Sequence, residues 1–110
     1  KSKYIIMQIQ INTDKNVEGN ERLVTYFTSE LNNELTRFDD KITRIEVHFG
    51  DENSTKFGKN DKRCLIEVRL AGLQPIAVTD QSESIEKAFY NALVKVKKIL
   101  ETTYEKMKAH

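Results

Sequence analysis

The sequence is poor in the residues that cross-link, kink or loosen a chain. Its 110 residues include one cysteine, one proline, four glycines and no tryptophan. A single cysteine can form neither an internal disulfide nor a CxxC metal knuckle, which suits a reducing cytosol. Glycine and proline are too scarce for a collagen-like or low-complexity chain. The longest apolar run, Tyr4–Met7, is far too short to cross a membrane or to form the core of a signal peptide.

Neither sign of charge is in excess. The chain has 18 lysines and arginines against 17 aspartates and glutamates, which gives a formal net charge of +1 at pH 7. Nucleic-acid binding would therefore depend on positive charge clustered at one place rather than on the total charge. A length of 110 residues leaves no room for a second hydrophobic core, so we expect a single domain over residues 1–110.

Four segments alternate apolar and polar residues, which is the pattern of strands with one buried face. They cover residues 4–11, 44–49, 63–70 and 74–79. In the last of these, Pro75 occupies a position that suits a strand start or a sheet edge. An exposed loop over residues 50–62 is expected between the second and third strands.

Two other segments have apolar residues three and four positions apart, which predicts amphipathic helices. The first follows Gly19-Asn20 and ends near Asp39-Asp40. The second spans residues 84–108 and follows a polar, acidic cap over residues 80–84. At 1.5 Å per residue the second helix would be roughly 37 Å long, so we expect it to extend beyond the sheet.

The predicted elements follow one another in the order β-α-β-β-β-α. A right-handed crossover makes the first two strands parallel neighbours, and short connections make the last three strands an antiparallel meander. Each helix has one apolar stripe and each strand has one apolar face. The economical arrangement is therefore a two-layer α+β sandwich, a four-stranded mixed sheet with both helices on one face.

The sequence gives no support to catalysis or metal binding. Cys64 belongs to the apolar set of its strand and His48 to the polar set of the strand before it, so the two cannot form a catalytic dyad. Residues 51–53 lack the spacing of an EF-hand calcium loop. Phosphate-binding glycine loops, nucleophile elbows and HExxH zinc motifs do not occur. We predict no enzyme, no metal, no cofactor and no small-molecule substrate.

The polar residues of the strands predict a sheet face in contact with water. The set consists of Gln8, Gln10, Arg44, Glu46, His48, Arg63, Glu67 and Arg69. Mixed charges on adjacent strands favour cross-strand ion pairs on such a face. The alternative is a surface that binds a partner through Arg63 and Arg69.

One flank of the last helix carries a row of polar and basic residues. At about 100° per residue, the row consists of Asn91, Lys95, Lys98, Thr102 and Lys106. Other lysines of this helix have an acid at the spacing of an intrahelical ion pair: Glu83–Lys87, Lys97–Glu101 and Glu105–Lys108. Lys95 and Lys106 have no such acid, and Lys98 has only Glu101. An unneutralised lysine row can lie beside phosphates, whereas the alternative is a helix face that contacts only water.

The two ends of the chain and its middle together resemble one protein family. The closing segment, residues 75–110, and the opening strand, residues 7–12, resemble the ribosome hibernation promoting factor family, which includes ribosome-associated inhibitor A and was once called sigma-54 modulation protein. Residues 16–18, ahead of an amphipathic helix, and residues 62–69 and 74–79 look like a short branch of that family. The resemblance covers essentially the whole chain.

This resemblance implies both a fold and a function. The fold would be related to double-stranded-RNA-binding domains. The protein would be cytoplasmic and would bind the small ribosomal subunit in the channel used by mRNA and tRNA, which silences translation and protects idle ribosomes under stress. Basic residues on the helices would meet rRNA phosphates. No reaction and no cofactor would be needed.

The resemblance also implies the binding residues. Basic positions of the family's last helix match four lysines, Lys95, Lys98, Lys106 and Lys108. Secondary candidates elsewhere in the chain are Arg22, Lys62 and Arg63. The alternative is a protein-interaction or stress module that kept the fold but lost rRNA binding. Its motivation is the near-neutral charge, together with Glu30 and Asn33 at positions where the family has lysines.

Overall fold

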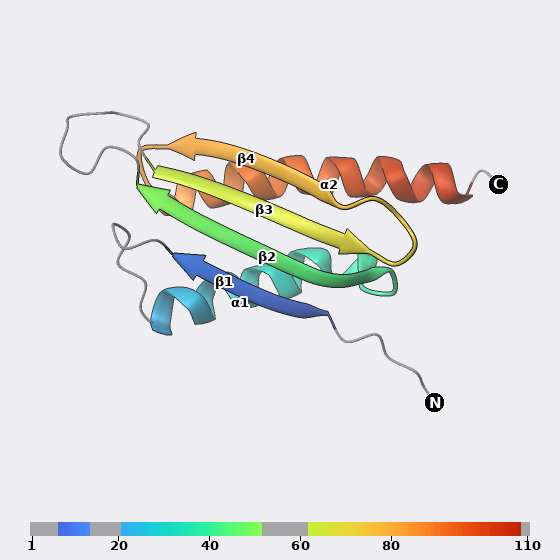
Figure 1. The fold of residues 1–110 in the computed structure, drawn as a ribbon, viewed down its shortest axis with the longest axis horizontal. Helices are drawn as coiled ribbons and strands as arrows, with labels where there is room; N and C mark the ends of the chain where they lie inside the picture. The colour runs from blue at the N-terminus through green and yellow to red at the C-terminus, as the bar shows by residue number, and fades with distance from the viewer. Residues whose placement is uncertain (1–6, 14–20, 52–61, 109–110) are drawn as a thin grey trace.

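The chain folds into a sheet covered on one face by two helices (Figure 1). The computed structural model describes residues 7–13, 21–51 and 62–108. Its elements are β1 (Gln8–Thr13), α1 (Glu21–Leu35), the 3-10 turn η1 (Thr36–Phe38), β2 (Ile42–Asp51), β3 (Lys62–Leu70), β4 (Ile76–Ser82) and α2 (Ile85–Lys108). The four-stranded sheet has the order β1-β2-β3-β4. β1 is parallel to β2 and the other neighbours are antiparallel, so the predicted α+β fold is confirmed.

The first strand differs from its prediction at both ends. Residues 4–6 of the predicted strand lie outside the described residues, as do residues 52–61 of the predicted loop. The predicted strand ends at Ile11, before the turn-forming residues Asn12 and Thr13, but both remain in β1 because they are paired with His48 and Phe49 of β2. Pairing with a neighbouring strand thus overrides the turn preference of these two residues.

The last strand also runs further than predicted. β4 begins directly after Pro75, which has no N–H to donate, and continues to Ser82 because residues 80–82 pair with residues 62–64 of β3. Residues 80–82 were expected to cap the last helix. The cap is Ser84, the last residue of the predicted cap over residues 80–84, and its Oγ accepts a hydrogen bond from the backbone N–H of Lys87 at 3.1 Å.

The hydrophobic core lies between the sheet and the helices. Phe27 of α1 contacts Phe49 of β2 and Phe89 of α2, with ring centroids 4.9 Å and 4.5 Å apart. The inward-facing residues of β2 and β3 and the apolar stripes of both helices form one continuous buried cluster. The C-terminal turns of α2 extend past the end of the sheet, as its predicted length implied (Figure 1).

Cys64 and His48 lie on opposite faces of the sheet, as predicted. Cys64 is 0% exposed in the core, and burial, with a smaller effect of the Asp80 charge, raises the pKa of its thiol to about 12. The side chain of His48 is 42% exposed on the other face. In the described ranges, His, Cys, Asp and Glu side chains form no group suited to a metal ion. No helix in those ranges has the length and apolar character needed to cross a membrane.

Candidate nucleic-acid interface

The cationic side chains of α2 are distributed over two flanks and an outer surface. Its buried stripe consists of Ala88, Phe89, Ala92, Leu93, Val96 and Leu100, which face the sheet and α1. One flank lies beside β4, and the other lies beside α1. The outer surface between the two flanks faces solvent. This division decides which of the predicted lysines are available to a partner.

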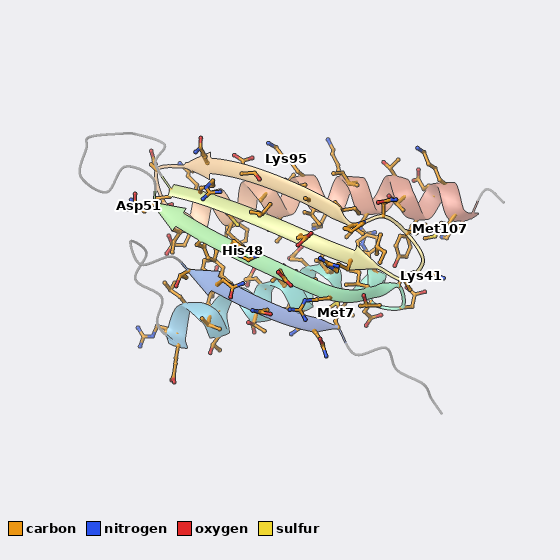
Figure 2. All side chains as sticks on the ribbon, viewed as in Figure 1. Met7, Lys41, His48, Asp51, Lys95 and Met107 are labelled. Atoms are coloured by element: carbon orange, nitrogen blue, oxygen red, sulfur yellow. The ribbon has the colours of Figure 1, made fainter. Side chains whose placement is uncertain are left out.

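Lys95 is held by an acid from the sheet. Its Nζ lies 2.7 Å from Oδ2 of Asp80 in β4, on the β4 side of the molecule (Figure 2). The expectation that Lys95 has no acidic partner is therefore wrong, because the partner belongs to another element and the intrahelical spacing rule cannot find it. The hydrogen bond from Lys95 is the main cause of the lowered pKa of the Asp80 carboxyl, so this carboxylate is charged at neutral pH.

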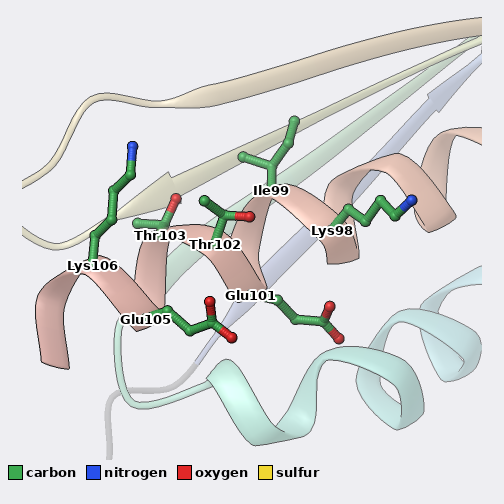
Figure 3. Close-up of a pocket in the computed structure, with 7 residues that line it drawn as sticks. All are labelled: Lys98, Ile99, Glu101, Thr102, Thr103, Glu105 and Lys106. Atoms are coloured by element: carbon green, nitrogen blue, oxygen red, sulfur yellow. The ribbon is translucent and has the colours of Figure 1, made fainter. Parts of the chain in front are cut away.

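Lys98 and Lys106 remain available. They line an open hollow on the surface of α2, together with Ile99, Glu101, Thr102, Thr103 and Glu105 (Figure 3). Within the described part of the chain, neither lysine forms an ion pair. Figure 3 shows Glu101 and Glu105 on the side of α2 towards α1, whereas Lys106 extends the other way. Lys98, Lys106 and Lys108 are thus the α2 lysines without an ion pair in the described residues, and the first two share this hollow.

Lys108 does not join them. It lines a separate hollow, together with Arg37 and Phe38 of η1 and with Glu101, Tyr104 and Glu105 of α2. The four lysines that the resemblance selected therefore do not form one strip. Two of them share the outer surface, one is paired with the sheet, and Lys108 faces the α1 side.

Two ion pairs with the α1–η1 segment replace the Lys97–Glu101 pair predicted within α2, and Glu105 and Lys108 form no ion pair within the described residues. Lys97 binds Glu34 of α1, with 2.6 Å between Nζ and Oε1, and Glu101 binds Arg37. Only Glu83–Lys87, at 3.2 Å, forms as the spacing predicted. The helices lie close enough side by side for these cross-helix partners to compete with the local ones, and each such pair removes a cation from the exposed surface.

Tyrosine hydroxyls complete the contact between the helices. Tyr90 donates a hydrogen bond to Glu30 at 2.9 Å, and its hydroxyl lies 2.5 Å from that of Tyr26. Tyr104 donates to the backbone carbonyl of Phe38 at 2.6 Å. The hydrogen bond with Tyr26 is the main cause that raises the pKa of Tyr90. Our sequence reasoning missed this seam, although its polar and aromatic residues recur every three or four positions on both helices.

The secondary candidates lie apart from Lys98 and Lys106. Arg22 is exposed in the first turn of α1, at the N-terminal end of both helices, whereas Lys106 is in the last turn of α2. Lys62 forms an ion pair with Asp51 at 3.3 Å. Arg63 alternates with the buried residues of β3 and so belongs to the sheet face away from the helices. The structure does not bring the predicted primary and secondary residues together.

Among the described residues of the open sheet face, Arg44 and Arg69 form ion pairs with acids of their own strands and not across strands. The register places Arg44 opposite Arg69, and Glu46 opposite Glu67. Opposite charges meet within each strand: Arg44 binds Glu46 at 2.6 Å, and Arg69 binds Glu67 at 3.7 Å. The prediction of cross-strand ion pairs is therefore wrong. The hydrogen bond from Arg44 is the main cause that lowers the pKa of Glu46, and this face is nearly neutral.

Comparison with known proteins identifies the family. The sequence model of the sigma 54 modulation protein / S30EA ribosomal protein family matches residues 9–108. The chain belongs to this family. Members of the S30EA family are ribosome-associated proteins and are not known as enzymes. The resemblance seen in the sequence is thereby confirmed at the level of the family.

Two solved structures show the same fold. The N-terminal domain of Protein Y from Thermus thermophilus superposes with a TM-score of 0.70 at 19% identity, over 88% of this chain and 99% of that one. A ribosomal subunit interface protein from Coxiella burnetii gives a TM-score of 0.70 at 19% identity, over 91% of this chain and 99% of that one. No curated protein sequence matches the chain.

Proposed function

We propose that this protein binds the small ribosomal subunit through rRNA in the channel used by mRNA and tRNA. By occupying that channel in the cytoplasm it silences translation and protects idle ribosomes under stress. Family membership supports a ribosomal partner. The observation that carries the site is the pair of exposed lysines Lys98 and Lys106, which form no ion pair within the described residues. No catalytic step is part of this function.

The shape and charge of α2 suit an RNA backbone. Lys98 and Lys106 are eight residues apart in the sequence, which places them about 12 Å apart along the helix axis at 1.5 Å per residue. RNA helices present a wide, shallow minor groove with phosphates at its rims, and proteins recognise it largely by shape and backbone contacts. Two ammonium groups on a convex helix surface can meet such phosphates and displace counterions.

Sedimentation of ribosomes on sucrose gradients tests the proposal. Lysate from starved cells is run at low and high salt, with wild-type protein and with the double variant Lys98→Gln, Lys106→Gln. We expect wild-type protein to co-sediment with small subunits or whole ribosomes at low salt. The double variant should bind more weakly, with a difference that shrinks as salt increases.

A matched control removes a cation from the other side of the molecule. Arg69→Gln takes one exposed positive charge from the open sheet face, and it should bind like the wild type when compared with Lys98→Gln or Lys106→Gln alone. Wild-type protein that never co-sediments with ribosomes would refute the proposed function. An equal loss of ribosome binding in Arg69→Gln and Lys98→Gln would refute the proposed site, but it would not refute the ribosomal partner.

A second candidate function is a protein-interaction or stress module that has lost rRNA binding. The neutralised cations of the helices favour it, since Lys95, Lys97 and Arg37 are all paired with acids. Affinity purification from starved cells separates the two functions. Capture of ribosomal components that disappears after RNase treatment supports the ribosomal function. Capture of one non-ribosomal protein, unchanged by RNase, supports the second candidate.

A further inference from the structure

Asp80 is the one acid of β4, and it points towards the helices. In the register it lies opposite Cys64, a core residue, so its side chain is on the helix face of the sheet. Both carboxylate oxygens are engaged: Oδ1 accepts the backbone N–H of Gln81 at 2.9 Å, and Oδ2 accepts Lys95 at 2.7 Å. The Asp80 side chain is only 17% exposed. The carboxylate is therefore fixed in place by the sheet.

Lys95 is far more accessible than its partner. Its side chain is 58% exposed, and it lies one turn before Lys98, at the edge of the outer surface of α2. A phosphate that approached Lys98 along this helix would come within reach of Lys95 as well. It would also approach the negative charge of Asp80, which cannot move away because its other oxygen is held by the backbone of Gln81.

We infer that Asp80 is an internal counter-ion that competes with RNA phosphates for Lys95 and so limits RNA affinity. This inference rests on the proposed function, and it concerns the strength of binding at the same surface. While Asp80 neutralises Lys95, that lysine does not neutralise an RNA phosphate, and so it displaces none of the cations condensed on the RNA. The slope of log affinity against log salt is then less steep, by about one phosphate contact, than it would be if Lys95 were also free to bind a phosphate.

Substitution of Asp80 by its neutral isostere provides the direct test. Affinity for salt-washed small ribosomal subunits is measured at several salt concentrations for wild type, Asp80→Asn, Lys95→Gln and the double variant. Asp80→Asn should bind about two- to five-fold more tightly at low salt, the size expected for releasing one exposed ion pair. The slope of log affinity against log salt should steepen by about one.

The lysine variants show whether the gain in affinity of Asp80→Asn requires Lys95. Lys95→Gln alone should change the affinity of the wild type little, because the lysine is already neutralised. In the Asp80→Asn background the same change should remove the gain. Binding of Asp80→Asn that equals or falls below the wild type overturns the inference, and so does a gain that persists without Lys95. Thermal unfolding of each variant confirms that all four are folded.

A control variant with the same change of net charge shows whether the position of the removed acid matters. Glu67→Gln also removes one acid and releases one cation, Arg69, but on the open face of the sheet. Its affinity should stay near that of the wild type, and a gain as large as that of Asp80→Asn overturns the inference. If wild type binds while Asp80→Asn gains nothing, the inference alone fails. If neither binds at any salt concentration, the proposed function fails with it, whereas binding by Asp80→Asn alone supports the inference and refutes the proposed function of the wild-type protein.

Discussion

Tyr104 and Phe38 join the C-terminal part of α2 to the turn that follows α1. The Tyr104 hydroxyl donates a hydrogen bond to the Phe38 carbonyl oxygen at 2.6 Å, and the two rings meet edge to face with centroids 5.0 Å apart. This contact lies where α2 begins to extend past the sheet, so it fixes a part of the helix that few other elements support.

Removing the Tyr104 hydroxyl should weaken this contact by a measurable amount. Tyr104→Phe keeps the ring contact and loses the hydrogen bond, which should lower the free energy of unfolding by about 0.5–1.5 kcal/mol. The loss stays small because the N–H of Lys41 also donates to the Phe38 carbonyl, at 3.2 Å. Urea denaturation measures it. An unchanged midpoint for Tyr104→Phe would show that the hydrogen bond adds nothing to stability.

Truncation of Phe27 should be the more severe change, because its ring joins three elements. Phe27 is 1% exposed and contacts the rings of Phe49 and Phe89. Phe27→Ala should cost about 3–5 kcal/mol of unfolding free energy, from lost burial and the cavity left behind. Val24→Ala is the matched control on the same helix, since Val24 is 38% exposed and should cost well under about 1 kcal/mol. Similar losses for both would contradict the assignment of Phe27 to the core.

The thiol of Cys64 should be unreactive in the folded protein. Burial raises its pKa to about 12, so at pH 8 it is protonated, and only the thiolate attacks thiol reagents. A disulfide reagent that reports on free thiols should react slowly in buffer and within seconds in denaturant. Fast labelling of the folded chain at pH 8 would show that Cys64 is reached by solvent.

The Asp80–Lys95 pair should contribute to stability at neutral pH but not in acid. The pKa of Asp80 is lowered in the folded state, mainly by Lys95, so its stabilisation is present above the ordinary pKa of about 4 and is lost as the pH falls through the folded value. Wild type should therefore exceed Asp80→Asn by up to about 1 kcal/mol near neutrality. Urea denaturation between pH 3 and 7 should show the difference shrinking below pH 4. A difference that stays constant down to pH 3 contradicts the pairing.

The residues that predicted the fold are those whose position depends on local periodicity. Ile45, Val47 and Phe49 alternate with polar neighbours, and burial of their side chains requires one face of a strand to meet a second layer. The period of three and four in α2 fixed its stripe in the same way. Only element ends were misjudged, as at Asn12 and at Ser82, because strand pairing with a distant segment decides where a strand stops.

What the sequence determined is therefore the pattern of buried faces, and with it the two-layer arrangement and the separation of Cys64 from His48. Only the tertiary structure decided which charged side chains form ion pairs and which do not. Asp80 and Lys95 are 15 positions apart in the sequence and belong to different elements, as do Glu34 and Lys97. Burial follows a local period that a sequence displays, whereas an ion pair depends on a few ångströms between side chains that only packing brings together.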